Sequence, residues 1–199
     1  MSNKINRRTF IKTAATAGGA AAILPQTLFS SGSKKRVKVG FIGTGLRGQW
    51  MLWLAAKYQE VEIPAICDID NEMIDNALKI LKEGGKPVPQ IYKNGEEDFL
   101  NLLHNEELDG VYIATPWKWH HPMAIAAMKS GKHVGTEVPA ALTVEECWDL
   151  VNTSEKTGKL CMIMENVCYR RDVMAIVNMV RQNIFGELLS LSTNQFRSF

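Results

Sequence analysis

The sequence predicts an α/β protein with a doubly wound parallel sheet, and three observations predict it. Runs of β-branched and aromatic residues alternate with runs of helical periodicity between residues 36 and 165. Glycine, proline or a polar residue separates most of these runs, and three glycines follow the first strand-like run. Strands that alternate with helices form βαβ units, and the strands of such units are parallel.

The expected strands are short apolar runs, several of which end at glycine, proline or an acidic residue. Short runs of this composition are typical of buried strands. We expect strands at residues 37–42, 61–67, 108–114, 133–137 and 160–164, and residues 87–92 as a loop that leads into a further short strand.

The expected helices carry apolar residues three and four positions apart. Met73, Ile74 and Ala77 show this spacing, and Gly84 closes their helix. Thr143 is the expected N-cap of a later helix, because its hydroxyl can accept from a free backbone amide. We expect helices at residues 49–57, 71–82, 96–104, 122–129 and 144–157.

The pattern changes after residue 165. A helix is expected at 172–181 and a strand at 188–196. One helix and one strand cannot bury a core of their own. Residues 166–199 are therefore interpreted as the truncated start of a second, C-terminal α/β domain.

Gly43, Gly45 and Gly48 have the G-x-G-x-x-G spacing of a dinucleotide-binding turn. The first glycine permits a sharp turn, the second lets a pyrophosphate approach bare backbone, and the third lets the helix pack closely. Asp68 lies 25 residues after Gly43, where a carboxylate binds a ribose 2′-hydroxyl and repels a 2′-phosphate. Residues 34–165 are therefore interpreted as a Rossmann domain that binds NAD, although Arg47 leaves a phosphate contact open.

Residues 1–33 contain four basic and no acidic residues ahead of a short apolar run. Arg7, Arg8, Phe10 and Lys12 resemble a twin-arginine export signal, and a solvated basic tail is the weaker interpretation. This route carries folded proteins, so we expect a periplasmic or otherwise exported protein that loads its cofactor first. The twin-arginine export machinery is then a partner.

The remaining charge is nearly balanced. The chain has a formal net charge of +2, but without the leader 19 basic residues face 21 acidic ones. This balance argues against a nucleic-acid partner. The cysteines have neither disulfide nor zinc spacing, so we expect buried small hydrophobes and no metal site. They are Cys67, Cys147, Cys161 and Cys168.

Further motifs follow the glycine turn in order. They are Val111 to Pro116, His120, Gly131 to Val134, Glu137 and Pro139. Over residues 36–190 this set resembles the Gfo/Idh/MocA proteins, a group of NAD(P)-dependent sugar oxidoreductases. The resemblance implies a Rossmann domain followed by a C-terminal α/β domain that carries most of the sugar site.

That family usually has lysine where this chain has Val138. The lysine assists proton transfer at the sugar hydroxyl, and valine cannot transfer a proton. Either another residue took the role, or the protein binds without catalysis, or it belongs to a subgroup. The leader, Trp117 to His120, Glu137 to Pro139 and Met164 to Tyr169 together resemble glycoside hydrolase family 109, the NAD-dependent α-N-acetylgalactosaminidases.

The resemblance implies a cycle of oxidation, elimination, addition and reduction. Tightly bound NAD accepts a hydride from C3 of the sugar, and the ketone acidifies the proton at C2. The glycosidic oxygen then leaves, water adds, and the hydride returns to C3. The cofactor performs the difficult step, so the paired carboxylates of ordinary glycosidases are not needed.

The resemblance also assigns residues. It implies cofactor contacts from Gly43, Gly45, Leu46, Arg47, Gly48, Asp68, Trp117, Lys118, Trp119, His120, Glu137, Val138 and Asn166, and a catalytic or sugar-contacting role for Tyr169. Ordinary structural roles remain open for the loop residues, such as helix capping or packing against the sheet edge.

Three functions therefore stay open from the sequence. The first is the NAD-dependent glycosidase acting on an α-linked N-acetylgalactosamine or related glycan. The second is a NAD-dependent sugar oxidoreductase of the wider family. The third is a non-catalytic nucleotide-binding fragment, because residues 1–199 alone lack a closed substrate site. Homo-oligomerisation is also left open.

Overall fold

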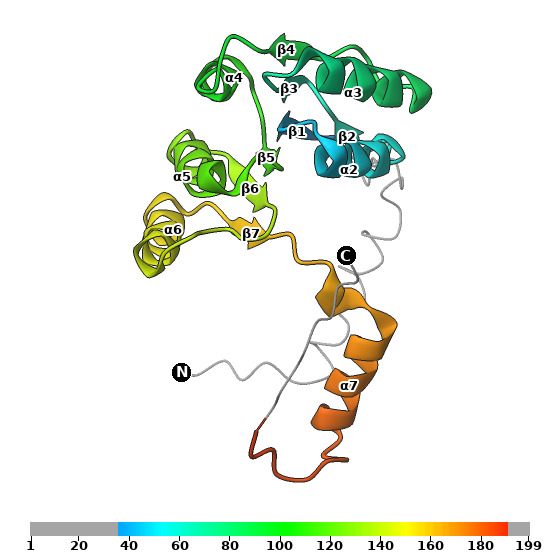
Figure 1. The fold of residues 1–199 in the computed structure, drawn as a ribbon, viewed down its shortest axis with the longest axis vertical. Helices are drawn as coiled ribbons and strands as arrows, with labels where there is room; N and C mark the ends of the chain where they lie inside the picture. The colour runs from blue at the N-terminus through cyan, green and yellow to red at the C-terminus, as the bar shows by residue number, and fades with distance from the viewer. Residues whose placement is uncertain (1–35, 191–199) are drawn as a thin grey trace, which may run out of the picture. The chain divides into compact units, whose positions relative to one another are not determined.

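The structure is a computed structural model that describes residues 36–190 (Figure 1). The predicted twin-arginine signal at 1–33 lies outside the described residues. So does the end of the strand expected at 188–196, and residues 188–190 have no regular structure.

The described residues form a parallel sheet with the strand order β4-β3-β1-β5-β6-β7, and β2 also pairs with β1. From β1 the chain adds β3 and then β4 on one side of the sheet. It then returns and adds β5, β6 and β7 on the other side. The point of reversal lies between β1 and β5, where open α/β sheets bind their ligands. The strands are β1 (Val37–Ile42), β2 (Val61–Glu62), β3 (Ala65–Cys67), β4 (Gln90–Tyr92), β5 (Gly110–Ile113), β6 (His133–Thr136) and β7 (Cys161–Ile163).

Helices cover both faces of this sheet (Figure 1). The helices α2 and α3 pack on one face, and α4, α5 and α6 pack on the other. The doubly wound prediction is confirmed. The helices are α2 (Leu46–Ala56), α3 (Asn71–Glu83), α4 (Phe99–Asn105), α5 (His120–Lys129) and α6 (Val144–Thr157), and the 3-10 helix η2 (Trp117–Trp119) precedes α5.

The core has two parts because successive residues of a strand point to opposite faces. Phe41 packs with Leu52 and Ile74 on the α2 and α3 side. Its neighbour Ile42 packs with Met128 in the cluster on the other face. Strands buried on both faces explain the nearly continuous apolar runs in the sequence.

Two elements differ from the prediction for local reasons. The strand expected at 61–67 is interrupted, because Pro64 has no backbone N–H to give to the sheet and only its carbonyl accepts, from Gln90. The helix α2 begins at Leu46 rather than at 49, since Gly45 is its N-cap and Gln49 donates to the Gly45 carbonyl. The glycine turn is therefore shorter than expected.

The expectation for the cysteines is confirmed for Cys67 and wrong for two others. Cys67 is buried in β3, and burial followed by the nearby Asp98 and Asp68 charges raises its pKa to about 12. Cys147 and Cys168 are exposed, because they lie on α6 and on the 3-10 helix η3 (Val167–Tyr169) rather than in the sheet.

The segment after β7 continues through η3 into α7 (Arg171–Arg181), as expected from its helical spacing. No residue of α7 is buried, so the segment adds nothing to the core of the sheet. Its assignment to a second domain remains a prediction. No helix within 36–190 has the length and apolar character needed to cross a membrane.

Candidate cofactor site

The glycine turn joins β1 to α2 with very little space around two of its glycines. Gly43 has a φ of +91°, and a Cβ there lies 2.7 Å from the Ala114 carbonyl group. A Cβ on Gly48 lies 2.1 Å from the Gly43 carbonyl oxygen. Both positions therefore require glycine for the turn to pack against the end of β5.

Gly45 differs from its two neighbours. A Cβ at this position meets nothing within 4 Å, and its φ of −63° suits any residue. The fold itself does not require glycine there. The open space in front of Gly45 fits a group that approaches bare backbone, as a pyrophosphate does.

The N-terminus of α2 supports the same assignment. No side chain caps it, and its first turn contains no acidic residue. The first amides of a helix have no partner within the helix and carry a partial positive charge. This end of α2 therefore favours an anion, and the residues present fit the phosphates of NAD.

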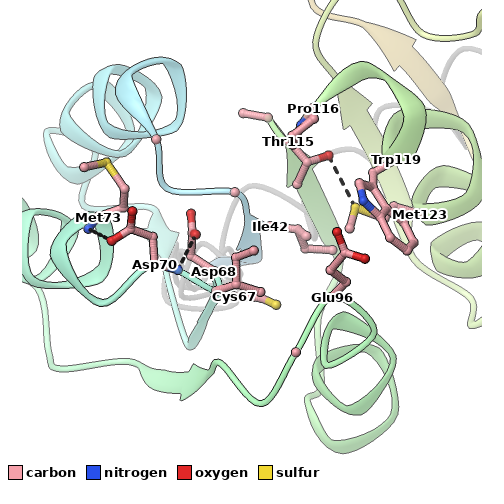
Figure 2. A pocket seen from close by; sticks show the side chains of 15 residues that line it. Ile42, Cys67, Asp68, Asp70, Met73, Glu96, Thr115, Pro116, Trp119 and Met123 are labelled. Carbon is pink, nitrogen blue, oxygen red and sulfur yellow. Dashed lines mark hydrogen bonds between the residues drawn. The ribbon is translucent and has the colours of Figure 1, made fainter.

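A cavity of about 440 Å³ lies beside the glycine turn (Figure 2). Its volume falls within the range of small-molecule sites, which is roughly 300–1,000 Å³. It lies at the reversal of strand order, as the fold predicts. Its lining comes from Ile42, Gly43, Gly45, Cys67, Asp68, Ile69, Asp70, Met73, Gly95, Glu96, Ala114, Thr115, Pro116, Trp119 and Met123.

Asp68 lies at the end of β3 and lines this cavity, as expected. Its Oδ2 accepts from the Thr44 backbone amide at 2.6 Å and from the Thr44 hydroxyl at 3.0 Å. Its Oδ1 accepts from the Asp70 amide at 3.0 Å. Asp68 therefore fixes the glycine turn as well as facing the ribose position. Sequence reasoning missed the fully buried Thr44, because a threonine inside a glycine turn carries no specific signal.

Asp70 adds a second carboxylate at the same end of the cavity, on the side opposite Thr115 and Trp119 (Figure 2). It also caps α3, accepting from the amides of Glu72 and Met73. Two carboxylates disfavour a 2′-phosphate, which supports NAD over NADP.

The opposite wall includes the loop at Gly95 and Glu96, and buried Asp98 organises that loop. Its carboxylate accepts from the Asn94 amide at 2.8 Å and from the Asn101 side chain at 2.7 Å. The Asn94 bond, followed by the Asn101 bond, lowers the pKa of Asp98 below its ordinary 3.8.

Asp98→Asn is expected to lower the free energy of unfolding at pH 7 by about 1–3 kcal/mol, because an amide cannot accept both bonds. A carboxylate with a lowered pKa in the fold stabilises above its unfolded pKa and loses that contribution as the pH falls. The difference between wild type and variant should therefore shrink below about pH 4. Urea unfolding at a series of pH values checks this, and a constant difference contradicts it.

A second polar cluster lies at the end of β6, where Glu137 is 8% exposed. Its Oε1 accepts from the Arg47 Nε at 2.7 Å and from the Tyr112 hydroxyl. Burial first, and then the hydrogen bond and charge of Glu137, raise the pKa of Tyr112. Burial by itself lowers the pKa of Arg47. The hydrogen bond to Glu137 and the negative charge of Glu137 outweigh this effect, so the pKa of Arg47 is raised.

The Arg47 guanidinium has further partners, since Nη2 donates to the Asn166 side chain at 3.4 Å and the group lies over Trp50. A cofactor contact from Arg47 remains a prediction. Arg47 therefore ties α2 to the segments that follow β6 and β7. Tyr112 carried no signal in the sequence, because an aromatic residue in a buried strand is normally a packing residue of the core.

Tyr112→Phe is expected to lower the free energy of unfolding by about 1 kcal/mol and to weaken NAD binding. The reason is that Glu137 loses one of its two donors. Tyr92→Phe is the matched control, because its hydroxyl also donates to a glutamate, Glu106, at 2.9 Å but outside the Glu137 cluster. Both variants should lose stability, and only Tyr112→Phe should change the dissociation constant for NAD, measured by calorimetry. Equal NAD affinities would contradict the role given to the cluster.

The other predicted residues divide into two groups. Gly43, Gly45, Asp68 and Trp119 line the cavity, and the half-buried Trp119 packs edge-on against Phe99. Five others lie outside the lining. Leu46, Trp117 and Val138 are exposed. Lys118 pairs with Glu96 at 3.5 Å, and the Asn166 side chain accepts a hydrogen bond from Arg47. Tyr169 is 66% exposed on η3, and its catalytic role remains a prediction.

His120 is buried at the start of α5. It is 1% exposed, and both ring nitrogens lie against backbone carbonyl oxygens rather than in the cavity lining. Both ring nitrogens are thus engaged by the backbone, and a cofactor contact from His120 remains a prediction.

The comparisons with known proteins agree with this geometry. A family model described as "Oxidoreductase family, NAD-binding Rossmann fold" matches residues 37–165. A "Glycosyl hydrolase family 109 protein" of Parabacteroides distasonis is 48% identical, and the match covers 92% of this chain and 43% of the relative. An "Alpha-N-acetylgalactosaminidase" of Tannerella forsythia is 46% identical over the same shares. The chain thus spans less than half the length of these curated relatives.

Solved structures show the same fold. Scyllo-inositol dehydrogenase from Lactobacillus casei, with bound NAD(H) and scyllo-inositol, has a TM-score of 0.67 and 24% sequence identity. The match covers 77% of this chain and 43% of that one. A NAD-binding protein from Listeria innocua has a TM-score of 0.63 and 29% identity, covering 77% of this chain and 42% of that one.

Proposed function

This chain belongs to the Gfo/Idh/MocA family of oxidoreductases, with their NAD-binding Rossmann fold, and on that premise we propose that the protein is a glycosidase. Its proposed substrate is an α-linked N-acetylgalactosamine or a related amino sugar. NAD stays bound and is regenerated in each turnover. The similarity to the Tannerella forsythia α-N-acetylgalactosaminidase supports the substrate class.

Val138 is the observation that carries the choice of reaction. It follows Glu137 directly at the carboxyl end of β6 and is 41% exposed. Sugar dehydrogenases of the family place a proton-transferring lysine here, and valine moves no proton. Oxidation at C3 releases the hydroxyl proton in a glycosidase as well as in a dehydrogenase, so another group must take that proton here. This departure from the dehydrogenase pattern favours a different overall reaction.

The residues of this chain serve the cofactor in this proposal. NAD, when bound, supplies hydride transfer to and from C3 of the sugar. Gly45 and the start of α2 hold its phosphates, and Asp68 faces its adenosine ribose. The Glu137 cluster fixes the segment beside the nicotinamide ribose. Tyr169 is proposed as a sugar contact beyond this cavity.

A chromogenic α-N-acetylgalactosaminide tests the proposal with the full-length gene product. We expect aglycone release that requires NAD and leaves no net NADH in the absorbance record. Stoichiometric NADH from a free sugar, without aglycone release, would instead assign a sugar oxidoreductase. NAD binding without either reaction would assign a non-catalytic nucleotide-binding protein.

We also propose that the protein is exported through the twin-arginine route with NAD already loaded. The support is the order of Arg7, Arg8, Phe10 and Lys12 ahead of an apolar run. Replacing both arginines with lysine should leave the precursor in the cytoplasm, as fractionation and immunoblotting would show. Lys4→Gln, outside the motif, should be exported normally. Equal export of the arginine-free precursor would refute the route.

A further inference from the structure

His120 begins α5 and is buried beneath the cavity wall, with its side chain in contact with two separate loops. Its Nδ1 lies 2.7 Å from the Pro139 carbonyl oxygen. Its Nε2 lies 2.7 Å from the Thr115 carbonyl oxygen. Both distances are short for nitrogen–oxygen hydrogen bonds, and charge-assisted bonds are typically this short.

The two partners determine how many protons the ring needs. A carbonyl oxygen only accepts hydrogen bonds, so each ring nitrogen must carry a hydrogen to bond to it. A neutral imidazole has one N–H, so it would set a nitrogen lone pair against one of the two carbonyl oxygens. Only the imidazolium form satisfies both contacts by donation, and the residue is 1% exposed.

We propose that His120 is a doubly protonated clamp that positions the nicotinamide side of the cofactor site. Thr115 follows β5 and lines the cavity, and Pro139 follows Glu137 and Val138 after β6. The ring therefore joins the ends of two neighbouring strands through their backbones. His120 is a positioning residue, since it acts on the cofactor through these segments. The role of His120 in positioning NAD rests on the proposed function, whereas its charge state follows from the two carbonyl contacts alone.

The ionisable groups of the surrounding elements are engaged with other partners. On β5 and after β6, Tyr112 and Glu137 bind each other and Arg47. Glu146 and Asp149 of α6 face α5 at His121, not at His120. Lys118 of η2 pairs with Glu96, and His104 of α4 is exposed. Within residues 36–190, the hydrogen-bond partners of the His120 ring are therefore these two carbonyl groups.

Nitrogen-15 NMR of histidine-labelled protein reads the charge state directly, without substrate or cofactor. The chain contains four histidines, and His133 is the internal contrast because its Nδ1 accepts from the Leu160 amide at 3.1 Å. At pH 7.5 we expect two protonated nitrogens for His120 and one unprotonated nitrogen for His133. Substituting His104, His121 and His133 in turn assigns the His120 signals by elimination. An unprotonated His120 nitrogen at that pH would overturn the proposal.

His120→Phe and His121→Phe form the matched pair for the positioning role. The first keeps a ring and removes both donors, and it should raise the dissociation constant for NAD about tenfold. The second should stay within about twofold, because His121 bonds only to α6. Equal affinities in two folded variants would overturn the positioning role. If wild type itself binds no NAD, the proposed function fails while the NMR result still decides the charge.

Discussion

Gly45→Ala is expected to abolish tight NAD binding while leaving the protein folded. The added methyl group meets no protein atom within 4 Å, and the backbone at φ −63° suits alanine. The same methyl group occupies the space through which a pyrophosphate reaches the backbone. We expect the dissociation constant for NAD to rise about a hundredfold, measured by calorimetry on protein freed of nucleotide.

Stability is the control for this prediction. Exchanging glycine for alanine at a helix N-cap costs at most about 1 kcal/mol, so the urea midpoint should change little. Unchanged NAD affinity in folded Gly45→Ala would place the phosphates elsewhere. A large loss of stability would mean that the fold, not the ligand, requires this glycine.

Gly48→Ala is expected to do the reverse and damage the fold. Its Cβ would lie 2.1 Å from the Gly43 carbonyl oxygen, and backbone atoms cannot move aside as a flexible side chain does. Alanine is favoured over glycine inside a helix by about 1 kcal/mol, which is too little to offset the overlap. We expect the free energy of unfolding to fall by about 3 kcal/mol.

Thermal unfolding of Gly48→Ala beside Gly45→Ala measures this contrast in one experiment. The two variants add the same methyl group three positions apart in the same turn. The expected order is a clear loss of melting temperature for Gly48→Ala and almost none for Gly45→Ala. Equal melting temperatures would show that α2 can move away from β5, contrary to the close packing described here.

Most of the fold follows from local sequence signals. Apolar runs predict the central strands because β3, most of β5 and the end of β1 are buried on both faces, and helical spacing predicts α3 and α6 almost to the residue. The start of α2 was missed because Leu46 and Arg47 carry no helix-start signal. The break at Pro64 shows that one missing N–H outweighs an apolar pattern.

The candidate site was predicted less completely, since side-chain partners depend on distant segments. The spacing of Gly43 and Gly45 and the position of Asp68 are local, and all three line the cavity. The bond from Arg47 to Glu137 joins residues 90 positions apart, and no short-range pattern encodes it. His120 was placed beside the cofactor because its motif is adjacent, whereas its ring turns to the carbonyl groups behind the wall.

Deuterium incorporation tests the central claim, that bound NAD drives glycoside cleavage, more directly than any substitution. The full-length protein is incubated in heavy water with an α-N-acetylgalactosaminide, and the released sugar is analysed by mass spectrometry and proton NMR. The proposed cycle removes the C2 proton and replaces it from solvent, so it predicts one deuterium at C2 of the released sugar. Release of a sugar that retains its original proton at C2 would contradict it.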